Sequence, residues 1–237
     1  MKAYGFIFAR EGSKGIPNKN TSPLCGKPLI AHAIETGMAT GRLEKVIVST
    51  DSEQIADIAK QYGALVPFLR PAHLATDTAN EWLAWQHAVQ FLMDAGEDFD
   101  TFVSLPATAP LRTVSDVLRC LALFEQGDCD LVLTYANAHR SPHFNMLSVD
   151  ENAFARIAVP LEKTPIRRQD APLVYDATTV AYISCPRHIL NARGLWDGKV
   201  KGVKVDTVNA LDIDEPIDLE MAEFFMRKRL GDMHAKD

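Results

Sequence analysis

Short apolar runs and amphipathic helical patterns alternate along most of the 237-residue chain. The apolar runs predict buried strands at 3–9, 45–50, 65–68, 101–105, 131–135, 179–184 and 200–205. Apolar positions three and four residues apart predict helices at 28–38, after 51, after 78, at 115–125 and at 216–229. Because strands that alternate with helices are typical of parallel sheets, the pattern predicts an α/β fold.

Polar residues mark where two of these helices begin. Asp51 with Gln54 and Thr78 with Glu81 are spaced as capping boxes, and each pair is predicted to cap the helix that follows it. Apolar stripes predict which helical side chains face the core. The predicted core side chains of the third and the last helix include Trp82, Trp85, Ile217, Met221, Phe224 and Phe225.

The segment from 136 to about 175 breaks this rhythm. It is rich in Pro, His, Arg and Asn and has only short apolar pieces. A long irregular stretch inside a compact domain is typical of a functional insertion or an oligomerisation arm. No repeat or low-complexity linker divides the chain, so we expect one domain over 1–237 with an arm at about 136–175.

Charge and composition exclude several classes of protein. The chain has 25 basic and 31 acidic residues, a net charge of -6, which argues against a general binder of nucleic acid or membrane surfaces. No apolar stretch is long enough to span a bilayer. The N-terminal apolar run ends at Arg10 and Glu11, too early for a secretion signal, and we expect a cytoplasmic protein. The four cysteines form no C-x-x-C pair, so neither a zinc site nor a disulfide framework is predicted.

The first predicted strand ends in a loop that combines glycines with basic residues. This loop holds Gly12 and Gly15 together with Arg10, Lys14 and Lys19. Ligands of open α/β sheets bind at the carboxyl ends of strands, and backbone N–H groups beside cations suit a polyphosphate. The spacing matches neither the dinucleotide-binding motif nor the P-loop. The alternative is a solvated basic loop that binds nothing.

A pair of aspartates near the C-terminus has two interpretations. Asp212 and Asp214 are two apart in an expected extended segment, so both carboxylates would lie on one face, as a Mg²⁺ site requires. Alternatively, Asp214 caps the last helix, with Pro216 in its first turn. A third loop, at 105–112, contains two prolines and is either part of a site or a plain connection.

These loops resemble, in sequence and in order, those of the CMP-sialic acid synthetases, the acylneuraminate cytidylyltransferases. The matching segments are 9–20, 48–51, Arg70-Pro71-Ala72 through Asp77-Thr78, Thr108 with Pro110-Leu111-Arg112, and Asp212-Ile213-Asp214. The resemblance covers the whole chain. It implies a Rossmann-like, mostly parallel sheet with helices on both faces, of the nucleotide-diphospho-sugar transferase type, and makes the arm a dimerisation element.

The resemblance also implies a reaction: CMP passes from CTP to the anomeric hydroxyl of a nine-carbon 2-keto acid sugar, and pyrophosphate is released. The implied nucleotide-binding residues are Arg10, Gly12, Ser13, Lys14, Lys19, Asn20, Arg70 and Thr78, with Arg10, Lys14 and Lys19 also catalytic. The implied sugar-binding residues are Thr108, Arg112, Arg168 and Tyr175, and the implied Mg²⁺ ligands are Asp212 and Asp214. The implied partners are CTP, the sugar and a second copy of the chain, which would help to complete each site. Nucleic acid and membranes are not expected as partners.

Two departures from the family pattern leave the sugar open. The first is Glu11, which stands where the family has Gly. The second comprises Pro106, where many sialic acid enzymes have a Gln that contacts the sugar, and Asp176-Ala177-Thr178-Thr179, which replaces the usual Arg-Pro-Asn-Gly after the aromatic position. The substrate could be N-acylneuraminate or a related nonulosonate such as legionaminate or pseudaminate. The alternatives are a CMP-KDO synthetase and a non-catalytic CTP-binding regulator. A dehydrogenase is a further alternative, but the sequence lacks the G-x-G-x-x-G motif that would support it.

Overall fold

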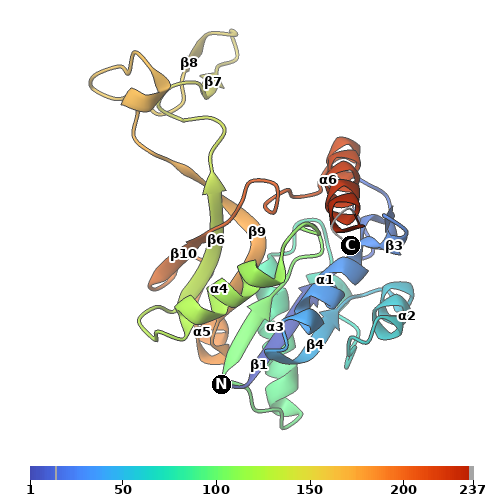
Figure 1. Cartoon of the computed structure of the whole chain (residues 1–237). Coiled ribbons are helices and arrows are strands. Elements are labelled where there is room, and N and C mark those ends of the chain that lie inside the picture. The colour runs from blue at the N-terminus through green and yellow to red at the C-terminus, as the bar shows by residue number, and fades with distance from the viewer. Residues whose placement is uncertain (14, 235–237) are drawn as a thin grey trace.

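The computed structural model describes residues 1–13 and 15–234. A six-stranded sheet forms its centre, in the order β10-β6-β9-β5-β1-β4. Its strands are β1 (Ala3–Phe8), β4 (Leu43–Ser49), β5 (Thr101–Ser104), β6 (Leu131–Asn137), β9 (Tyr175–Ser184) and β10 (Val200–Lys204). All are parallel except β9, which runs antiparallel to both neighbours. The predicted mostly parallel α/β sheet is confirmed (Figure 1).

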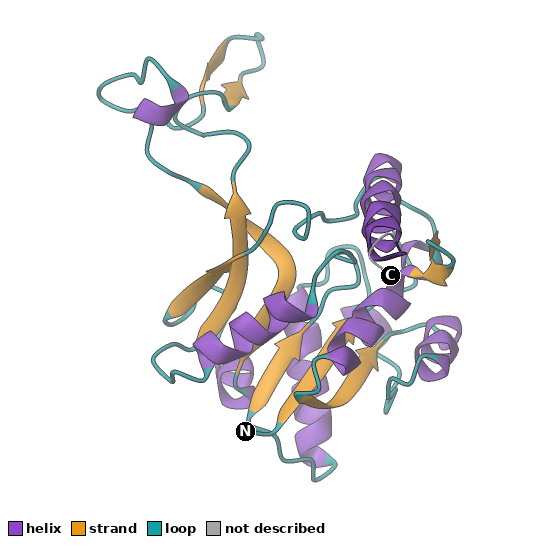
Figure 2. Ribbon diagram, viewed as in Figure 1, coloured by secondary structure: helices purple, strands orange, loops and turns teal. Residues whose placement is uncertain are grey.

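Helices cover both faces of this sheet, as Figure 2 shows. The helices are α1 (Leu29–Ala39), α2 (Glu53–Gln61), α3 (Glu81–Asp94), α4 (Val114–Phe124), α5 (Pro186–Asn191) and α6 (Pro216–His234). Side chains of α1, α2 and α4 pack in one core, and the aromatic side chains of α3 pack with α5 in the other. Trp82 and Trp85 are buried there, as predicted. Within the described residues, no helix is long and apolar enough to cross a membrane.

The irregular segment between β6 and β9 extends away from the sheet (Figure 1). It carries a small hairpin, β7 (Leu147–Val149) with β8 (Ala155–Ile157), and a 3-10 turn at Arg168–Asp170. Several of its apolar side chains are exposed: Leu147, Val149, Phe154, Ile166 and Leu173. The chain therefore forms an arm where the sequence predicted one, and the arm has an apolar surface of its own.

Two helix starts differ from the prediction. The α2 helix is preceded by Ser52, and the Asp51 carboxylate instead accepts a hydrogen bond from the Glu11 backbone N–H at 3.0 Å. The α3 helix is capped by Asn80, whose side chain accepts from the Trp82 N–H at 3.0 Å, so Thr78 is not the cap. In both places several consecutive polar residues could cap the helix, and the spacing of the capping-box motif predicted the wrong residue as the cap.

Two apolar patterns were also misread. The predicted strand at 65–68 is reduced to two isolated bridges, one from Leu65 to Ile47 of β4 and one from Leu69 to Thr50 just beyond β4. In α6, Ile217 and Phe224 are 54% and 64% exposed, and Met221 is exposed as well. The buried side of α6 instead contains Leu219, Ala222, Phe225 and Met226.

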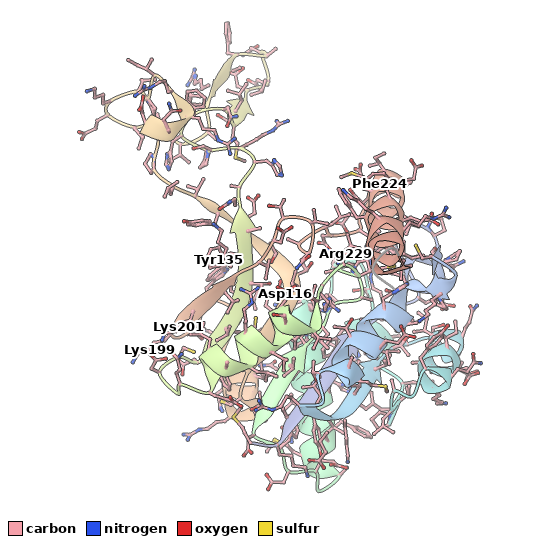
Figure 3. The ribbon with its side chains drawn as sticks, in the orientation of Figure 1. Asp116, Tyr135, Lys199, Lys201, Phe224 and Arg229 are labelled. Carbon is pink, nitrogen blue, oxygen red and sulfur yellow. The ribbon has the colours of Figure 1, made fainter. Side chains whose placement is uncertain are left out.

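A polar network that includes Arg229 and Asp116, both labelled in Figure 3, ties α6 to α4. Arg229 donates to the Leu111 carbonyl at 2.7 Å and to the Asn209 side chain at 2.6 Å. Asn209 in turn donates to the Asp116 carboxylate at 2.7 Å. These bonds fix the chain that leads from β10 back over the sheet, and that chain carries Asp212 and Asp214 toward the end of β1. Two short pairing strands, β2 (Pro23–Leu24) and β3 (Lys27–Pro28), complete the structure below α6.

Candidate active site

A cavity of about 280 Å³ opens at the carboxyl ends of β1 and β5. It is lined by the loop after β1, the segment 70–81 before α3, the loop after β5, and β9. The lining residues are Phe8, Arg10, Gly12, Ser13, Lys19, Asn20, Arg70, Leu74, Thr76, Asp77, Ala79, Glu81, Pro106, Ala107, Thr108, Thr179 and Tyr182. Three loops that lie far apart in the sequence thus meet where ligands of α/β sheets bind.

The loop after β1 is held in place by its polar side chains. The Asn20 amide donates to the Arg10 carbonyl at 3.0 Å, which closes the loop on itself. The Arg10 guanidinium is paired with Asp77 at 2.6 Å. Arg10 is therefore positioned in the cavity wall before any ligand binds. Lys14, which the sequence also assigned to this site, lies outside the described residues.

Glu11 points away from the cavity. The Ser52 hydroxyl donates to its carboxylate at 3.4 Å, and Glu11 lines a separate small hollow beside α2. The carboxylate that departs from the family pattern is therefore turned away from the proposed phosphate side.

The basic loop and the aspartate pair come together, as the polyphosphate interpretation requires. The Lys19 ammonium donates to the Ile213 carbonyl at 2.6 Å and to the Asp214 carboxylate at 3.1 Å. Gly15 lies against the same segment: a Cβ at this position would stand 2.0 Å from the Asp214 carbonyl oxygen. Lys19 and Gly15 thus join two motifs that are separated by almost two hundred residues.

The two aspartates do not cap α6. The Asp218 carboxylate accepts from the backbone N–H groups of Asp214 and Glu215 at 3.0 and 2.8 Å, so Asp218 takes that part. The Asp214 carboxylate is 72% exposed and free to bind further ligands beside Lys19. Ile213 is buried between the aspartates, and the two carboxylates are near enough for the charge of Asp214 to act on Asp212.

Asp212 is the more enclosed of the pair. Its Oδ1 is buried and has no hydrogen-bond partner among the described residues. Burial raises the pKa of its carboxyl group and the negative charge of Asp214 adds to this, while the nearby hydroxyls of Thr108 and Thr179 act to lower it. Ile213 donates to the Thr108 carbonyl at 2.8 Å, which docks the aspartates against the loop after β5. An orphaned carboxylate oxygen beside a second carboxylate fits a divalent cation that prefers hard oxygen ligands.

Comparison with known proteins agrees with this geometry. Residues 4–139 match the model of a family described as cytidylyltransferase. The chain belongs to the cytidylyltransferase family. It is 33% identical to post-translational flagellin modification protein B of Campylobacter coli, over 98% of this chain and 97% of the relative. It is 30% identical to CMP-N,N'-diacetyllegionaminic acid synthase of Legionella pneumophila, over 95% of this chain and 97% of the relative.

A solved structure shares the fold of this cytidylyltransferase. CMP:2-keto-3-deoxy-manno-octonic acid synthetase complexed with CTP superposes with a TM-score of 0.72, over 97% of this chain and 100% of that chain. The two sequences are 16% identical. The nucleotidyltransferase fold expected from the sequence is confirmed.

Arg70 is built into the wall of the cytidylyltransferase cavity. Its guanidinium donates to the hydroxyl of Ser49 at 3.1 Å and to the carbonyl of the same residue, and it lies over the Phe8 ring. These contacts use the end of β4 to fix the cation. Thr78 does not line the cavity, although its neighbours Asp77 and Ala79 do.

Arg112 lies behind the cavity wall, so the expectation that it contacts the sugar is not supported. The guanidinium is buried, donates to the Val180 carbonyl at 2.8 Å and to the Pro106 carbonyl, and does not line the cavity. Burial lowers its pKa to about 9. Its bonds fix the loop after β5 against β9, so Arg112 shapes the wall that Thr108 and Pro106 present.

Arg168 and Tyr175 do not reach the cavity of their own chain. Arg168 donates to the Ala138 carbonyl at 2.7 Å at the root of the arm. Tyr175 packs edge-on against the Tyr135 ring, with Lys204 over its face. Of the four predicted sugar-binding residues, only Thr108 lines the cavity.

Sequence reasoning missed three polar residues of the cavity wall. Glu81, Thr179 and Tyr182 line the cavity between the 70–81 segment and β9. Burial raises the pKa of Tyr182 to about 12. From the sequence, Glu81 was assigned to a capping box, and Thr179 and Tyr182 were assigned to a buried strand. The position of β9 between β5 and β6 brings Thr179 and Tyr182 to the cavity, and the start of α3 brings Glu81 there.

Gly15 offers a direct check of how closely the two motifs pack. We expect Gly15→Ala to lower kcat/KM by about tenfold or more, because the new Cβ must push the loop away from the Asp214 carbonyl. Gly194→Ala is the matched control, since nothing lies within 4 Å of a Cβ there. Equal kinetics for both variants would mean that the loop and the aspartates need not stay in contact.

Proposed function

We propose that the chain transfers CMP from CTP to the anomeric hydroxyl of a nine-carbon 2-keto acid sugar, N-acylneuraminate or a related nonulosonate, and releases pyrophosphate. The observation that carries the proposal is the convergence of the basic loop and the aspartate pair, through Lys19, beside a cavity at the end of β1. The relative from Legionella, named as a legionaminic acid synthase, supports a nonulosonate as the sugar.

The residues of the cavity suit nucleotidyl transfer. The sugar hydroxyl oxygen attacks the α-phosphorus of CTP and releases its proton to solvent, and the bond to the bridging oxygen of the β-phosphate breaks. Negative charge develops on the departing pyrophosphate. Arg10 and Lys19, held in place by Asp77 and by the 213–214 segment, are set to stabilise that charge without having to reorganise. Lys14, in the same loop, would add a third cation.

We assign Asp212 and Asp214 as ligands of Mg²⁺. The orphaned Oδ1 of Asp212 and the exposed carboxylate of Asp214 are the oxygen donors that such an ion prefers. When bound, the ion would neutralise charge on the phosphates. Lys19 holds the Asp214 carboxylate against the basic loop and so keeps the ligand pair beside the triphosphate side of the cavity.

We propose that the arm is the dimerisation element and that it delivers Arg168 to the site of the partner subunit. Arg168 lies outside the cavity of its own chain, and the arm exposes apolar side chains such as Ile166 and Leu173. The carboxylate of the sugar is costly to bury without a cation, and Arg168 would supply one. Because the reaction consumes CTP, we place the enzyme in the cytoplasm.

Mixing two defective variants tests whether Arg168 acts across the dimer. Lys19→Met lacks the central cation, and Arg168→Ala lacks the arm cation. If the arm completes the partner's site, reassembled mixtures at limiting sugar should recover about a quarter of wild-type activity, since half the dimers are mixed and each has one intact site. Light scattering should give twice the chain mass of 26.2 kDa. A monomer, or mixtures that recover nothing, would contradict the proposed arrangement.

Pyrophosphate release measured with CTP and a panel of 2-keto acid sugars tests the proposed function. The panel should contain N-acetylneuraminate, a legionaminate, a pseudaminate and KDO. We expect turnover with at least one nine-carbon sugar and at least tenfold less with KDO. A preference for KDO would establish the CMP-KDO synthetase alternative, and binding of CTP without turnover of any sugar would establish a regulator.

A further inference from the structure

One carboxylate in the cavity has no part in the chemistry described so far. Glu81 is the first residue of α3 and lines the cavity between Arg70 and Tyr182. The residue as a whole is exposed, whereas its carboxyl group is desolvated by the surrounding residues, which raises its pKa. Glu81 lies in the wall formed by segment 70–81, within electrostatic reach of Arg70 and of Asp212.

The neighbours of Glu81 fix its orientation. The indole N–H of Trp85, one turn along α3, donates to Glu81 Oε1 at 3.3 Å. Trp85 itself is 2% exposed and packs against Tyr182 and Phe102, so this donor is held rigidly. One carboxylate oxygen is therefore occupied by the indole, and the second is left as an acceptor for a ligand in the cavity.

The charged neighbours of Glu81 in this wall, Arg70 and Asp77, are both engaged in contacts within the protein. Arg70 is a fixed cation, bonded through Ser49 and lying over the Phe8 ring. The other carboxylate of the lining, Asp77, is already paired with Arg10 at 2.6 Å. Of the carboxylates that line the described cavity, Glu81 is thus the one placed to accept from a ligand beside Arg70.

We propose that Glu81 is the specificity-determining residue that selects cytosine over uracil, by accepting a hydrogen bond from the exocyclic amino group of the base. The inference rests on the proposed function, since it takes the ligand to be a pyrimidine nucleoside triphosphate. Cytosine carries an amino donor at position 4, whereas uracil carries a carbonyl oxygen there. A carboxylate oxygen attracts the first and repels the second. Discrimination is strong where a buried polar group would otherwise be left unpaired or opposed.

The hydrogen bond from Trp85 fixes how a substituted side chain at position 81 is oriented. In Glu81→Gln the amide oxygen stays on the indole N–H, which turns the amide NH₂ toward the base. That group opposes the amino group of cytosine and matches the carbonyl of uracil. We expect kcat/KM for CTP to fall at least tenfold and the ratio of kcat/KM for CTP over UTP to fall further, because UTP gains a donor.

Two further variants complete the experiment. Glu53→Gln makes the same change at the first position of α2, outside the cavity, and should keep the wild-type ratio. Glu81→Ala removes the acceptor without adding a donor, so it should lower the CTP preference less than Glu81→Gln does. Binding of CTP and UTP, followed by tryptophan fluorescence, gives the same comparison without turnover, and thermal melting checks that each variant is folded.

The possible outcomes separate this inference from the proposed function. If the wild-type chain binds and uses CTP while both Glu81 variants keep its CTP-to-UTP ratio, the inference is wrong and the function stands. If the wild-type chain binds neither nucleotide, the function itself is wrong. A CTP preference that collapses in Glu81→Gln and survives in Glu53→Gln supports the assignment.

Discussion

Replacing Asp212 by asparagine is expected to lower kcat/KM by about a thousandfold, or about 4 kcal/mol of transition-state stabilisation. The change keeps the shape of the side chain and removes the negative charge of a carboxylate whose buried Oδ1 has no hydrogen-bond partner among the described residues. The fold should not suffer. Because burial raises the pKa of Asp212, its charged form destabilises the native state at neutral pH, and a neutral asparagine relieves that cost.

Kinetics and thermal melting together distinguish a metal ligand from a structural residue. For Asp212→Asn we expect the loss of activity with an unchanged or slightly higher Tm. Asp218→Asn is the matched control, because Asp218 caps backbone N–H groups at the start of α6 and asparagine caps nearly as well. A drop in Tm without a loss of Mg²⁺-dependent turnover in Asp212→Asn would assign this residue to the fold.

Lys19→Met should have the second largest effect, a loss of about 2–4 kcal/mol in kcat/KM, which is the scale of one preorganised electrostatic contact. Its ammonium group is the contact that joins the basic loop to the 213–214 segment, and only 13% of the side chain is exposed. Methionine keeps the length of the side chain and removes its charge and its donors. Both the triphosphate and the Asp214 carboxylate would lose a partner.

The control for this change is Lys27→Met, a few residues further along. Lys27 is exposed and pairs with Glu35 at 2.7 Å, so its removal should cost no more than about 1 kcal/mol of stability and leave the kinetics alone. Steady-state kinetics with varied CTP and varied Mg²⁺ measure both variants. Kinetics of Lys19→Met as good as those of Lys27→Met would show that the link between the two motifs has no catalytic role.

The fold could be predicted from the sequence where a pattern had one interpretation. The buried strand β1 is an almost continuous apolar run, and the core tryptophans of α3 follow a helical stripe. The pattern failed where two solutions were equally good locally. In α6 either of two apolar stripes could face inward, and packing against Leu24 and Leu111 selected the one with Ala222.

The candidate site could be predicted only in part, for a related reason. Glycines and cations after the first strand predict a loop that binds polyphosphate, and the structure brings that loop to Asp214 through Lys19. Arg112 was misplaced because a sequence cannot tell a guanidinium that lines a cavity from one that binds backbone carbonyls behind it. Glu81 was missed because its place in the cavity depends on how α3 packs against β9, through contacts such as that between Trp85 and Tyr182.

The most direct measurement is identification of the products formed from CTP and a nine-carbon 2-keto acid sugar in the presence of Mg²⁺. Mass spectrometry of the reaction mixture should show a CMP ester of the sugar, and an enzymatic assay should find pyrophosphate in equal amount, neither forming when the sugar is left out. Formation of CMP or CDP with free phosphate, or of no CMP ester with any sugar of this class, would contradict the account.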